Sequence, residues 1–367
     1  MKTESAVLLE YKKPLVIEEL ELDAPKDREV LIEMKAAGLC HSDYSIIQGK
    51  FSMPPLPCIP GHEGAGVVKE VGPNVTRVKP GDHVIVLWVP VCGQCYYCLR
   101  GHHHLCAEKD KVRAGTMLDG THRIRKGDQN INVMMGVGVF SRYNVMSELS
   151  VVPVDKDVPF DSACIVGCAV ITGVGAVLNR AKIRAGSTVA VVGVGGIGLN
   201  IIQGAVLGNA SKIIAIDILD NKLEFAKQFG ATHVINAAKE DPIEAVLKLT
   251  NNIGVDYSFE ALGRSETTFT AFKLIRRGGQ AVIAGIPALD DGLMLPLFEV
   301  SLMEKSIIGT YCGSGDGRIE TINLVNLYKN KRLKLDELIT KRYRFEEINT
   351  GFEDLASGKN ARGVIIF

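Results

Sequence analysis

Four cysteines lie close together in the sequence, at Cys92, Cys95, Cys98 and Cys106. Thiolates at this spacing can surround one Zn²⁺ ion tetrahedrally, with each sulfur about 2.3 Å from the metal. Buried or disulfide-paired cysteines are the alternative, but four cysteines within fifteen positions favour a shared metal ion. The sequence therefore predicts a closed, structural zinc site in this segment.

Three histidines, His102, His103 and His104, lie in the same segment. Because four thiolates already saturate a zinc ion, we expect these histidines to be solvated loop residues. The chain has nine cysteines in all, an odd number that is atypical of a small disulfide framework and typical of metal thiolates in a reducing cytosol. No secretory signal is expected either, because the apolar run Val7–Leu9 is too short for one. These features predict a cytoplasmic protein.

A glycine-rich turn follows an apolar, β-branched run and precedes a helical pattern. Its glycines are Gly193, Gly195, Gly196 and Gly198, and Asp217 ends the next apolar run 24 residues after Gly193. This context is that of a dinucleotide site, where the pyrophosphate approaches the helix N-terminus and the acidic residue binds the adenosine ribose. An aspartate there repels a 2′-phosphate, and Ile218 follows it in place of an arginine. The pattern therefore predicts NAD, and not NADP, as the cofactor; a purely structural glycine turn is the alternative.

A third group of candidate ligands is dispersed along the chain, at Cys40, His62 and Cys168. Individually, such a histidine or cysteine is more often a core residue than a ligand. Together they supply two thiolates and one imidazole, a set that leaves the fourth position of zinc open to water or substrate.

The composition limits the classes of protein to which the chain can belong. Its 367 residues exceed the size at which a single hydrophobic core stops growing, so two domains are expected. Apolar residues make up 46% and charged residues 23%, as in a soluble globular protein. The formal net charge is zero, which argues against a general nucleic-acid binder. Although Val189–Gly208 is long and apolar enough to resemble a membrane span, its glycines favour a strand, a turn and a buried helix.

The elements that must position these residues change in character along the chain. The first 160 residues or so indicate short strands separated by Gly/Pro turns, whereas the chain from about residue 186 alternates strands and helices. Such alternation predicts a parallel sheet with helices on both faces. A final strand suggests a return to the first domain. The expected strands are Val30–Met34, Gly66–Val71, His83–Val89, Thr188–Val192, Lys212–Ile216, Thr232–Ile235, Val255–Glu260, Gln280–Ala284 and Gly363–Phe367, and the expected helices extend to Leu207 and over Asn221–Phe229.

These motifs occur in the order, and at about the spacing, of the zinc-dependent medium-chain alcohol dehydrogenases, which the sequence resembles over essentially its whole length. The matching segments are Gly-Leu-Cys-His-Ser-Asp at 38–43, Gly-His-Glu-Gly-Ala-Gly at 61–66, the four-cysteine segment, Gly-Cys at 167–168, the glycine turn, and Ser-Gly-Lys at 357–359 leading to Arg362. The stretch Gly115–Arg123 is most similar to the subgroup that includes the glutathione-dependent formaldehyde dehydrogenases.

The resemblance implies an α/β fold in which a Rossmann-type doubly wound parallel sheet is inserted after a β-rich, GroES-like catalytic domain. The implied boundaries are 1–169 for the catalytic zinc-binding domain, 170–312 for the NAD-binding domain and 313–367 for the return to the catalytic domain. It also implies a homodimer with two zinc ions per chain, one catalytic and one structural, and no nucleic-acid or membrane partner. The implied reaction is reversible hydride transfer between an alcohol and NAD, giving an aldehyde or ketone.

The resemblance also assigns roles to individual residues. Cys40, His62 and Cys168 would bind the catalytic zinc, Asp43 and Glu63 would orient His62 and tune the metal, and Ser42 would hydrogen-bond the reacting oxygen. Thr172 and Ile197 would contact the nicotinamide, Asp217 and Lys222 the adenosine ribose, and His41 and Arg362 the pyrophosphate. Trp88, Met134 and Met135 would line the substrate pocket.

Two departures from the family pattern leave alternatives open. Some members have a histidine three residues after the serine that corresponds to Ser42, and this histidine passes the proton to solvent. This chain has Ser45 at that position. The loop 50–53, Lys-Phe-Ser-Met, lacks the acidic residues that would recognise a glutathione adduct. A simple alcohol is therefore the predicted substrate. A thiol-adduct formaldehyde dehydrogenase and a non-catalytic nucleotide-binding protein are the alternatives.

Overall fold

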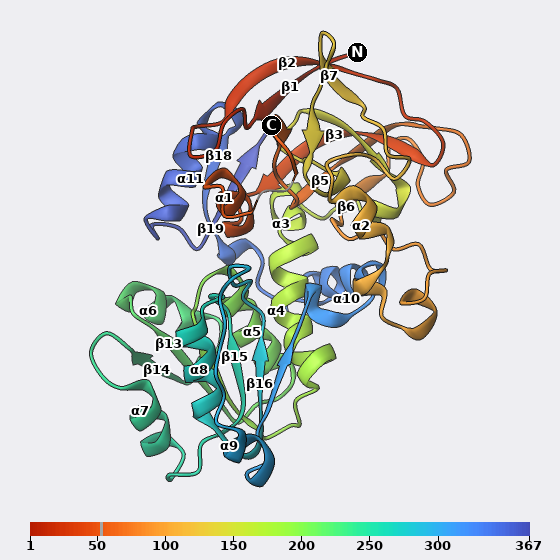
Figure 1. Ribbon diagram of the computed structural model, residues 1–367. Helices are drawn as coiled ribbons and strands as arrows, with labels where there is room; N and C mark the ends of the chain where they lie inside the picture. The colour runs from red at the N-terminus through yellow and green to blue at the C-terminus, as the bar shows by residue number, and fades with distance from the viewer. Residues whose placement is uncertain (52–53) are drawn as a thin grey trace. The chain divides into compact units, whose positions relative to one another are not determined.

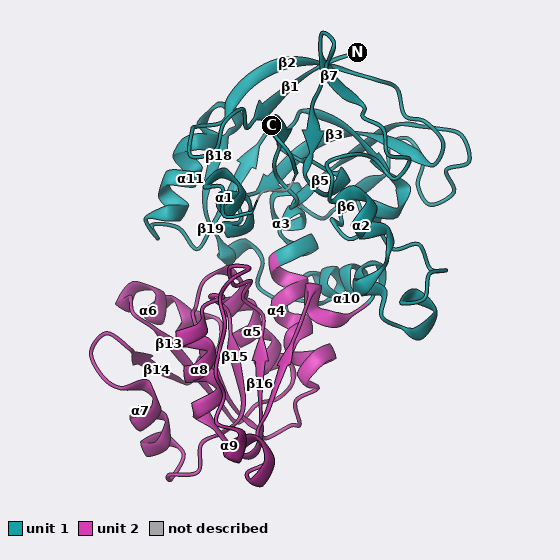
Figure 2. Cartoon of the chain, viewed as in Figure 1, with its two compact units in different colours: residues 1–168, 316–367 teal, residues 169–315 magenta. Residues whose placement is uncertain are grey.

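The computed structural model describes residues 1–51 and 54–367. The chain divides into two compact units, one formed by 1–168 with 316–367 and the other by 169–315. Figure 2 shows the second unit as one continuous segment between two parts of the first. The sequence predicted these boundaries at 169/170 and 312/313.

Unit 1 is built mostly on antiparallel strands (Figure 1), with two parallel pairs, β18–β19 and β4–β9. Its largest sheet has the order β11-β6-β5-β3-β19-β18, with β10 also pairing with β3, and a smaller sheet has the order β1-β2-β7-β8. Short strands β4 and β9 form a third pair. The strands are β1 (Lys2–Val7), β2 (Val16–Leu22), β3 (Glu29–Gly38), β4 (Cys58–Ile59), β5 (Gly64–Val71), β6 (His83–Val86), β7 (Ile124–Lys126), β8 (Gln129–Asn130), β9 (Asn132–Val133), β10 (Tyr143–Ser147), β11 (Val151–Val154), β18 (Ile339–Arg344) and β19 (Arg362–Ile366).

The last strand of the chain lies against one of the first. β19 pairs antiparallel with β3, so that Val364 lies opposite Gly38. The backbone N–H of Leu39 also donates to the Gly363 carbonyl, at 2.9 Å. This pairing completes unit 1 with residues that follow unit 2 in the sequence. The helices of this unit are α1 (His41–Ile47), α2 (Glu108–Val112), α3 (Phe160–Cys164), α10 (Gly317–Lys329) and α11 (Ile348–Ala356).

Unit 2 contains one parallel sheet with the strand order β14-β13-β12-β15-β16-β17. Buried apolar side chains of its central strands form the core, as expected where helices cover a parallel sheet. Its strands are β12 (Thr188–Val192), β13 (Lys212–Asp217), β14 (His233–Asn236), β15 (Val255–Glu260), β16 (Ile275–Ile283) and β17 (Ser306–Gly309). Its helices are α4 (Ile171–Gly175), α5 (Gly196–Leu207), α6 (Asp220–Gln228), α7 (Pro242–Leu249), α8 (Ser265–Leu274) and α9 (Leu297–Leu302).

One helical stretch, Phe160–Ala181, is long and apolar enough to cross a membrane by length and composition, and 89% of its apolar window is buried inside the structure. Such burial is expected of a core helix. It contains π-helical turns at Val166–Val170 and Ala176–Ala181, the first of which carries Cys168. The segment Val189–Gly208, which the composition singled out, is β12, a turn and α5.

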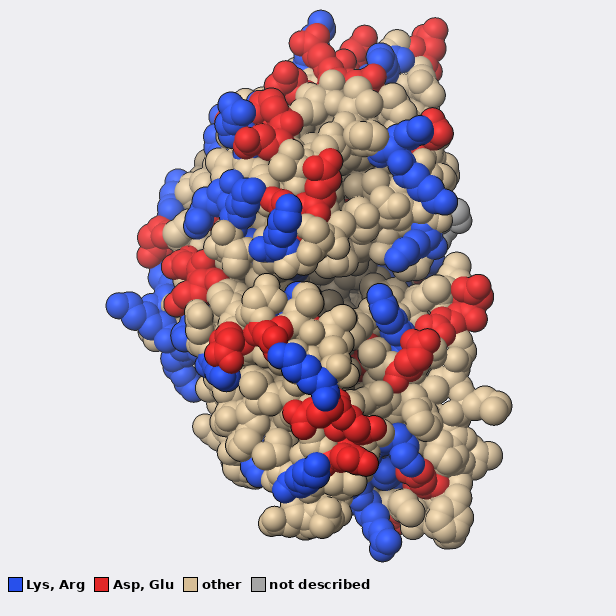
Figure 3. All heavy atoms as spheres, turned by 90° about the vertical axis from the view of Figure 1, so that its left-hand side faces the viewer, with Lys and Arg blue, Asp and Glu red and all other residues tan. Residues whose placement is uncertain are grey.

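The predicted doubly wound parallel sheet and β-rich first domain are both observed, and several element boundaries differ. β12 and β15 match the predicted spans, whereas β6 ends at Val86 and not at Val89. β16 begins at Ile275, before the predicted Gln280. The prediction began too late because two arginines and two glycines interrupt the apolar pattern of this strand. Acidic and basic side chains are interspersed over the face in Figure 3, as the balanced composition leads one to expect.

Candidate active site

The dispersed candidate ligands converge within unit 1. One ligand atom each from Cys40, His62, Glu63 and Cys168 lies within 4.8 Å of the others, and all four residues are buried. The His62 Nε2 atom lies 3.2 Å from the Cys168 Sγ atom. Two thiols, an imidazole and a carboxylate gathered in this way are the donor types that zinc prefers. The residues therefore fit a zinc ion.

Local structure explains how these residues meet. Cys40 is the N-cap of α1, and the Asp43 carboxylate in the first turn accepts a hydrogen bond from the Cys40 backbone N–H. The same carboxylate accepts the Gly61 N–H at 3.1 Å and lies 2.9 Å from His62 Nδ1. Asp43 thereby joins the start of α1 to the segment before β5. Because it engages Nδ1, it directs Nε2 of His62 toward the cysteine sulfurs.

The prediction that Glu63 orients His62 requires a correction. The structure pairs Glu63 Oε1 with the Arg362 guanidinium, at 2.7 Å, and Asp43 alone of the two carboxylates contacts the imidazole. Burial raises the pKa of Glu63 to about 7, despite the opposing charge of Arg362. Its Oε2 atom is buried without a hydrogen-bond partner among the described residues. Glu63 is therefore a potential ligand itself, a possibility that the sequence did not indicate.

Arg362 lies in the same cluster. Its guanidinium donates to the Leu39 carbonyl at 3.1 Å as well as to Glu63, and the residue is 4% exposed. A hydrogen bond with Cys168 lowers the pKa of the Cys40 thiol well below its usual value, and His62 and Arg362 lower it further. The predicted contact of Arg362 with a pyrophosphate stays a prediction.

The remaining residues predicted around the substrate lie in unit 1. Ser42 is half-buried and His41 exposed in the first turn of α1, and Ser45 is half-buried in the next turn. The Trp88 ring lies edge-on to His62, with ring centroids 5.8 Å apart. Met134 is buried and Met135 is half-buried with a left-handed backbone. Of the predicted pocket residues, the structure thus places Trp88 directly against the ligand cluster. Residues 52–53 of the loop 50–53 lie outside the described residues.

The four-cysteine segment forms a second cluster. The cysteine sulfurs are separated by 3.5 to 4.0 Å in the pairs Cys92–Cys106, Cys92–Cys98 and Cys95–Cys106. Tetrahedral coordination with Zn–S bonds of about 2.3 Å requires sulfurs about 3.8 Å apart. Although burial opposes it, backbone N–H groups of Ala107 and Cys98 lower the pKa of Cys95 to about 6. The geometry and donor set fit a closed zinc site.

The adjacent histidines are less solvated than the sequence predicted. His102 is exposed, but His103 and His104 are half-buried. His103 Nδ1 lies 3.6 Å from Asp316, the N-cap of α10. This contact connects the four-cysteine segment to Asp316, the residue at which the chain re-enters unit 1.

Unit 2 contains the glycine turn at the carboxyl end of β12. Gly193 has a φ of +89°, and a Cβ on Gly198 would lie 1.9 Å from the Gly193 carbonyl oxygen, so both positions require glycine. A Cβ on Gly195 would meet nothing within 4 Å. The N-terminus of α5 has no side-chain cap, which leaves its N–H groups available to an anion. This turn fits a dinucleotide pyrophosphate.

Asp217 lies beside this turn at the end of β13. One carboxylate oxygen accepts the Val194 N–H at 3.0 Å, and the other accepts the N–H groups of Ile218 and Leu219 at 2.8 and 3.2 Å. The backbone therefore holds the carboxylate in place and leaves acceptor capacity for ribose hydroxyls. Of the other predicted cofactor contacts in this unit, Thr172 is buried in α4, and Ile197 and Lys222 are half-buried in α5 and α6.

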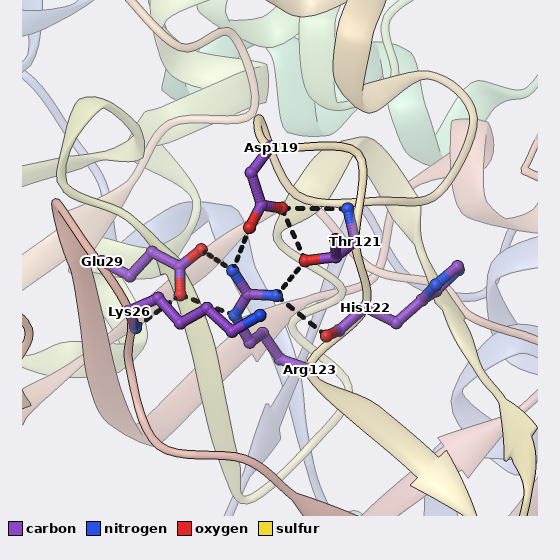
Figure 4. A network of polar contacts seen from close by, with 6 residues as sticks. All are labelled: Lys26, Glu29, Asp119, Thr121, His122 and Arg123. Carbon is purple, nitrogen blue, oxygen red and sulfur yellow. Dashed lines mark hydrogen bonds and ion pairs between the residues drawn. The ribbon is translucent and has the colours of Figure 1, made fainter.

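The stretch Gly115–Arg123 has a structural role in this fold. Figure 4 shows the Arg123 guanidinium between Glu29 and Asp119, with nitrogen–oxygen distances of 2.6 and 2.7 Å. The arginine is 3% exposed. Because both carboxylates occupy it, Arg123 cannot bind the carboxylate of a thiol substrate. The stretch therefore contributes an ion-pair network around a buried arginine.

Comparisons with known proteins agree with this geometry. Residues 26–156 match the family of alcohol dehydrogenase GroES-like domains, and residues 196–330 match the zinc-binding dehydrogenase family. The chain is 43% identical over 370 positions to the NDMA-dependent alcohol dehydrogenase of Amycolatopsis methanolica, covering 100% of this chain and 99% of the relative. The chain belongs to the zinc-dependent medium-chain alcohol dehydrogenase family. The predicted family is thereby confirmed.

Further relatives of this alcohol dehydrogenase family include both predicted reaction types. The S-(hydroxymethyl)glutathione dehydrogenase of Paracoccus denitrificans is 40% identical over 376 positions, with full coverage of both chains. The crystal structure of benzyl alcohol dehydrogenase from Acinetobacter calcoaceticus is similar with a TM-score of 0.95 and 32% identity, covering 100% of this chain and 99% of that one. The chain is accordingly a zinc-dependent alcohol oxidoreductase.

Proposed function

We propose that the protein reversibly oxidises apolar primary or secondary alcohols, aromatic and allylic ones included, with NAD as the hydride acceptor and without a thiol. The observation that carries the proposal is the convergence of Cys40, His62 and Cys168 in unit 1. It is supported by a second chelating cluster and by a glycine turn beside an acidic residue. We also propose a cytoplasmic location, which is supported by the cysteines of the described residues, because none of them forms a disulfide.

In this proposal Cys40, His62 and Cys168 hold one zinc ion, and the four cysteines Cys92 to Cys106 hold another. Bound zinc acts as a Lewis acid that lowers the pKa of an alcohol hydroxyl. Asp43 holds the Nδ1 side of His62, so that Nε2 keeps its lone pair for the metal. Ser42, two residues after Cys40, accepts the hydroxyl proton.

The glycine turn and Asp217 would hold the dinucleotide, which would supply the hydride acceptor of the reaction when bound. Thr172 and Ile197 contact the nicotinamide, Lys222 contacts the ribose with Asp217, and His41 and Arg362 contact the pyrophosphate. Trp88, Met134 and Met135 give the substrate an apolar surface with one flat wall. The loss of hydride and proton converts the alcohol to an aldehyde or ketone.

One assay series tests this function. Zinc content is measured first, and NADH formation is then followed with benzyl alcohol in the absence of thiols. We expect turnover of benzyl alcohol. Strict dependence on glutathione for formaldehyde oxidation, with no turnover of benzyl alcohol, would contradict the proposal. It would favour the thiol-adduct reaction for which the Paracoccus relative is named. Turnover with NDMA but without release of NADH would instead favour the dependence named for the Amycolatopsis relative.

Cofactor choice is expected to depend on Asp217. Asp217→Gly should reduce the preference for NAD over NADP, because it removes both the ribose acceptor and the charge that repels a 2′-phosphate. The measurement is kcat/KM for each cofactor. Asp220→Asn, which removes the exposed carboxylate paired with Lys239, is the matched control and should leave the ratio nearly unchanged. Equal kcat/KM values for the two cofactors in the wild type would contradict the assignment.

We further propose that the protein is a homodimer formed through unit 2. Helix α9 turns Glu299 inward to Lys273 and Lys305 and exposes Leu297, Phe298 and Leu302. The following strand, β17, is at the edge of the sheet, so no strand of the described part of the chain pairs with its outer backbone groups. A second copy supplies both an antiparallel edge strand and a matching apolar helix about a two-fold axis.

Sedimentation should therefore give twice the 39.7 kDa mass of the chain. Phe298→Asp is expected to shift the protein to the mass of one chain, because dimerisation would bury the new charge. Leu99→Asp, at an exposed leucine of the four-cysteine segment, is the control and should remain dimeric. A wild-type protein of single-chain mass would disprove the proposed interface.

A further inference from the structure

A buried carboxylate in unit 2 has no role in the proposed chemistry. Glu260 is the last residue of β15 and is fully buried. It lies opposite Val192 of β12, immediately before the glycine turn. No ion pair of this carboxylate occurs within residues 1–51 and 54–367, and its Oε2 atom has no hydrogen-bond partner there. A buried carboxylate without a cation is costly, so its presence calls for a specific function.

Among the residues that the structure describes, all the hydrogen bonds of this carboxylate are made by its other oxygen. Oε1 accepts the backbone N–H groups of Leu262 and Gly263, at 2.9 and 2.8 Å, and the Thr267 hydroxyl at 2.7 Å. The Leu262–Gly263 turn follows β15 directly, and Gly263 has a φ of +75°. The side chain of Glu260 therefore fixes the conformation of the turn that begins two residues after it.

This turn lies against both neighbouring loops at the carboxyl edge of the sheet. A Cβ on Gly193, the first glycine of the dinucleotide turn, would lie 2.5 Å from the Leu262 Cγ atom. On the other side, a Cβ on Gly263 would lie 2.4 Å from the Ile286 carbonyl oxygen, in the loop after β16. Leu262 thus packs on the glycine turn, although the residue as a whole is 47% exposed.

We propose that Glu260 is a positioning residue for dinucleotide binding, which holds Leu262 against Gly193 and so keeps the glycine turn in its binding conformation. The inference rests on the proposed NAD site. In open parallel sheets, ligands bind at the carboxyl edge where these loops meet. A turn free to move there would cost binding energy, because the dinucleotide would have to order it.

The test compares variants by the dissociation constant of NADH, measured by calorimetry on the zinc-loaded protein. Glu260→Leu keeps the volume and removes the acceptor, and we expect it to raise Kd at least about tenfold. Glu260→Gln retains an acceptor oxygen and should stay within about threefold of the wild type. Thr267→Val removes one hydrogen bond to the same oxygen but leaves the turn tied, and is also expected within about threefold.

The outcomes separate a positioning role from a merely structural one. A folded Glu260→Leu protein with unchanged Kd, or a Thr267→Val protein weakened equally, would overturn the inference. If Glu260→Leu does not fold, Leu262→Ala gives the answer, since it removes the contact with Gly193 and leaves the buried carboxylate in place; an unchanged Kd would again overturn the inference. A wild-type protein that binds neither NADH nor NADPH would overturn the proposed cofactor along with it.

Discussion

Replacing Cys168 with alanine is expected to abolish alcohol oxidation while leaving a folded chain that retains about one zinc ion. The reason is the separation of the two clusters: Cys168 lies 3.2 Å from His62, and no cysteine of the 92–106 segment belongs to that group. Removing the Cys168 thiolate leaves Cys40 as the one thiolate of the proposed ligand set Cys40, His62 and Cys168, which is too few to hold the metal. Elemental analysis and the melting temperature give the two readouts.

Two further variants make the result specific. Cys164→Ala removes a buried free cysteine from the same helical stretch, outside both clusters, and should retain both metal ions and activity. Cys95→Ala should instead lose the other zinc and lower stability, because metal binding to such a closed site contributes directly to folding. A fully active wild-type enzyme with one zinc per chain would contradict the two-site proposal.

The second large effect is expected at Ser42. Ser42→Ala should lower kcat by about 10²- to 10⁴-fold, the usual contribution of a positioned proton acceptor. The residue lies two positions after Cys40, in the first turn of α1. Ser42→Thr keeps a hydroxyl and should retain activity, which distinguishes the lost proton acceptor from a general disturbance of the helix.

Ser45→Ala is the matched control one turn further along the same helix, and it should retain most of the activity. The metal content of each variant must equal that of the wild type, so that a loss of rate is not a loss of zinc. An alanine variant at position 42 within about twofold of the wild-type rate would remove Ser42 from the mechanism.

The α/β half of the fold was predictable because its strands are buried on both faces. Thr188–Val192 and Val255–Glu260 are short runs bounded by turn residues, and both match the observed strands. By contrast, β1 and β2 were not predicted. Glutamates interrupt the apolar residues of β2, so this segment has no continuous apolar run from which a strand could be predicted.

The active-site cluster was predictable only in part. The local spacing of the four-cysteine segment predicts its zinc site, whereas Cys40, His62 and Cys168 were assigned through the family resemblance. The pairing of Glu63 with Arg362 joins residues 299 positions apart, and no local pattern encodes a contact at that separation. The π-helical turn that carries Cys168 was equally invisible, because its sequence is uniformly apolar.

The pairing of β19 with β3 has a consequence for the order in which the protein is made. On the ribosome the first 168 residues emerge long before Arg362, and the whole of unit 2 is synthesised in between. During that interval Glu63 lacks its partner guanidinium, and the last residues of β3, Ala36 to Gly38, lack the neighbouring strand β19. Nascent unit 1 therefore cannot complete its sheet, or pair the Glu63 carboxylate, until Arg362 and β19 have been synthesised. Unit 2 is one continuous segment and can fold as soon as it has emerged.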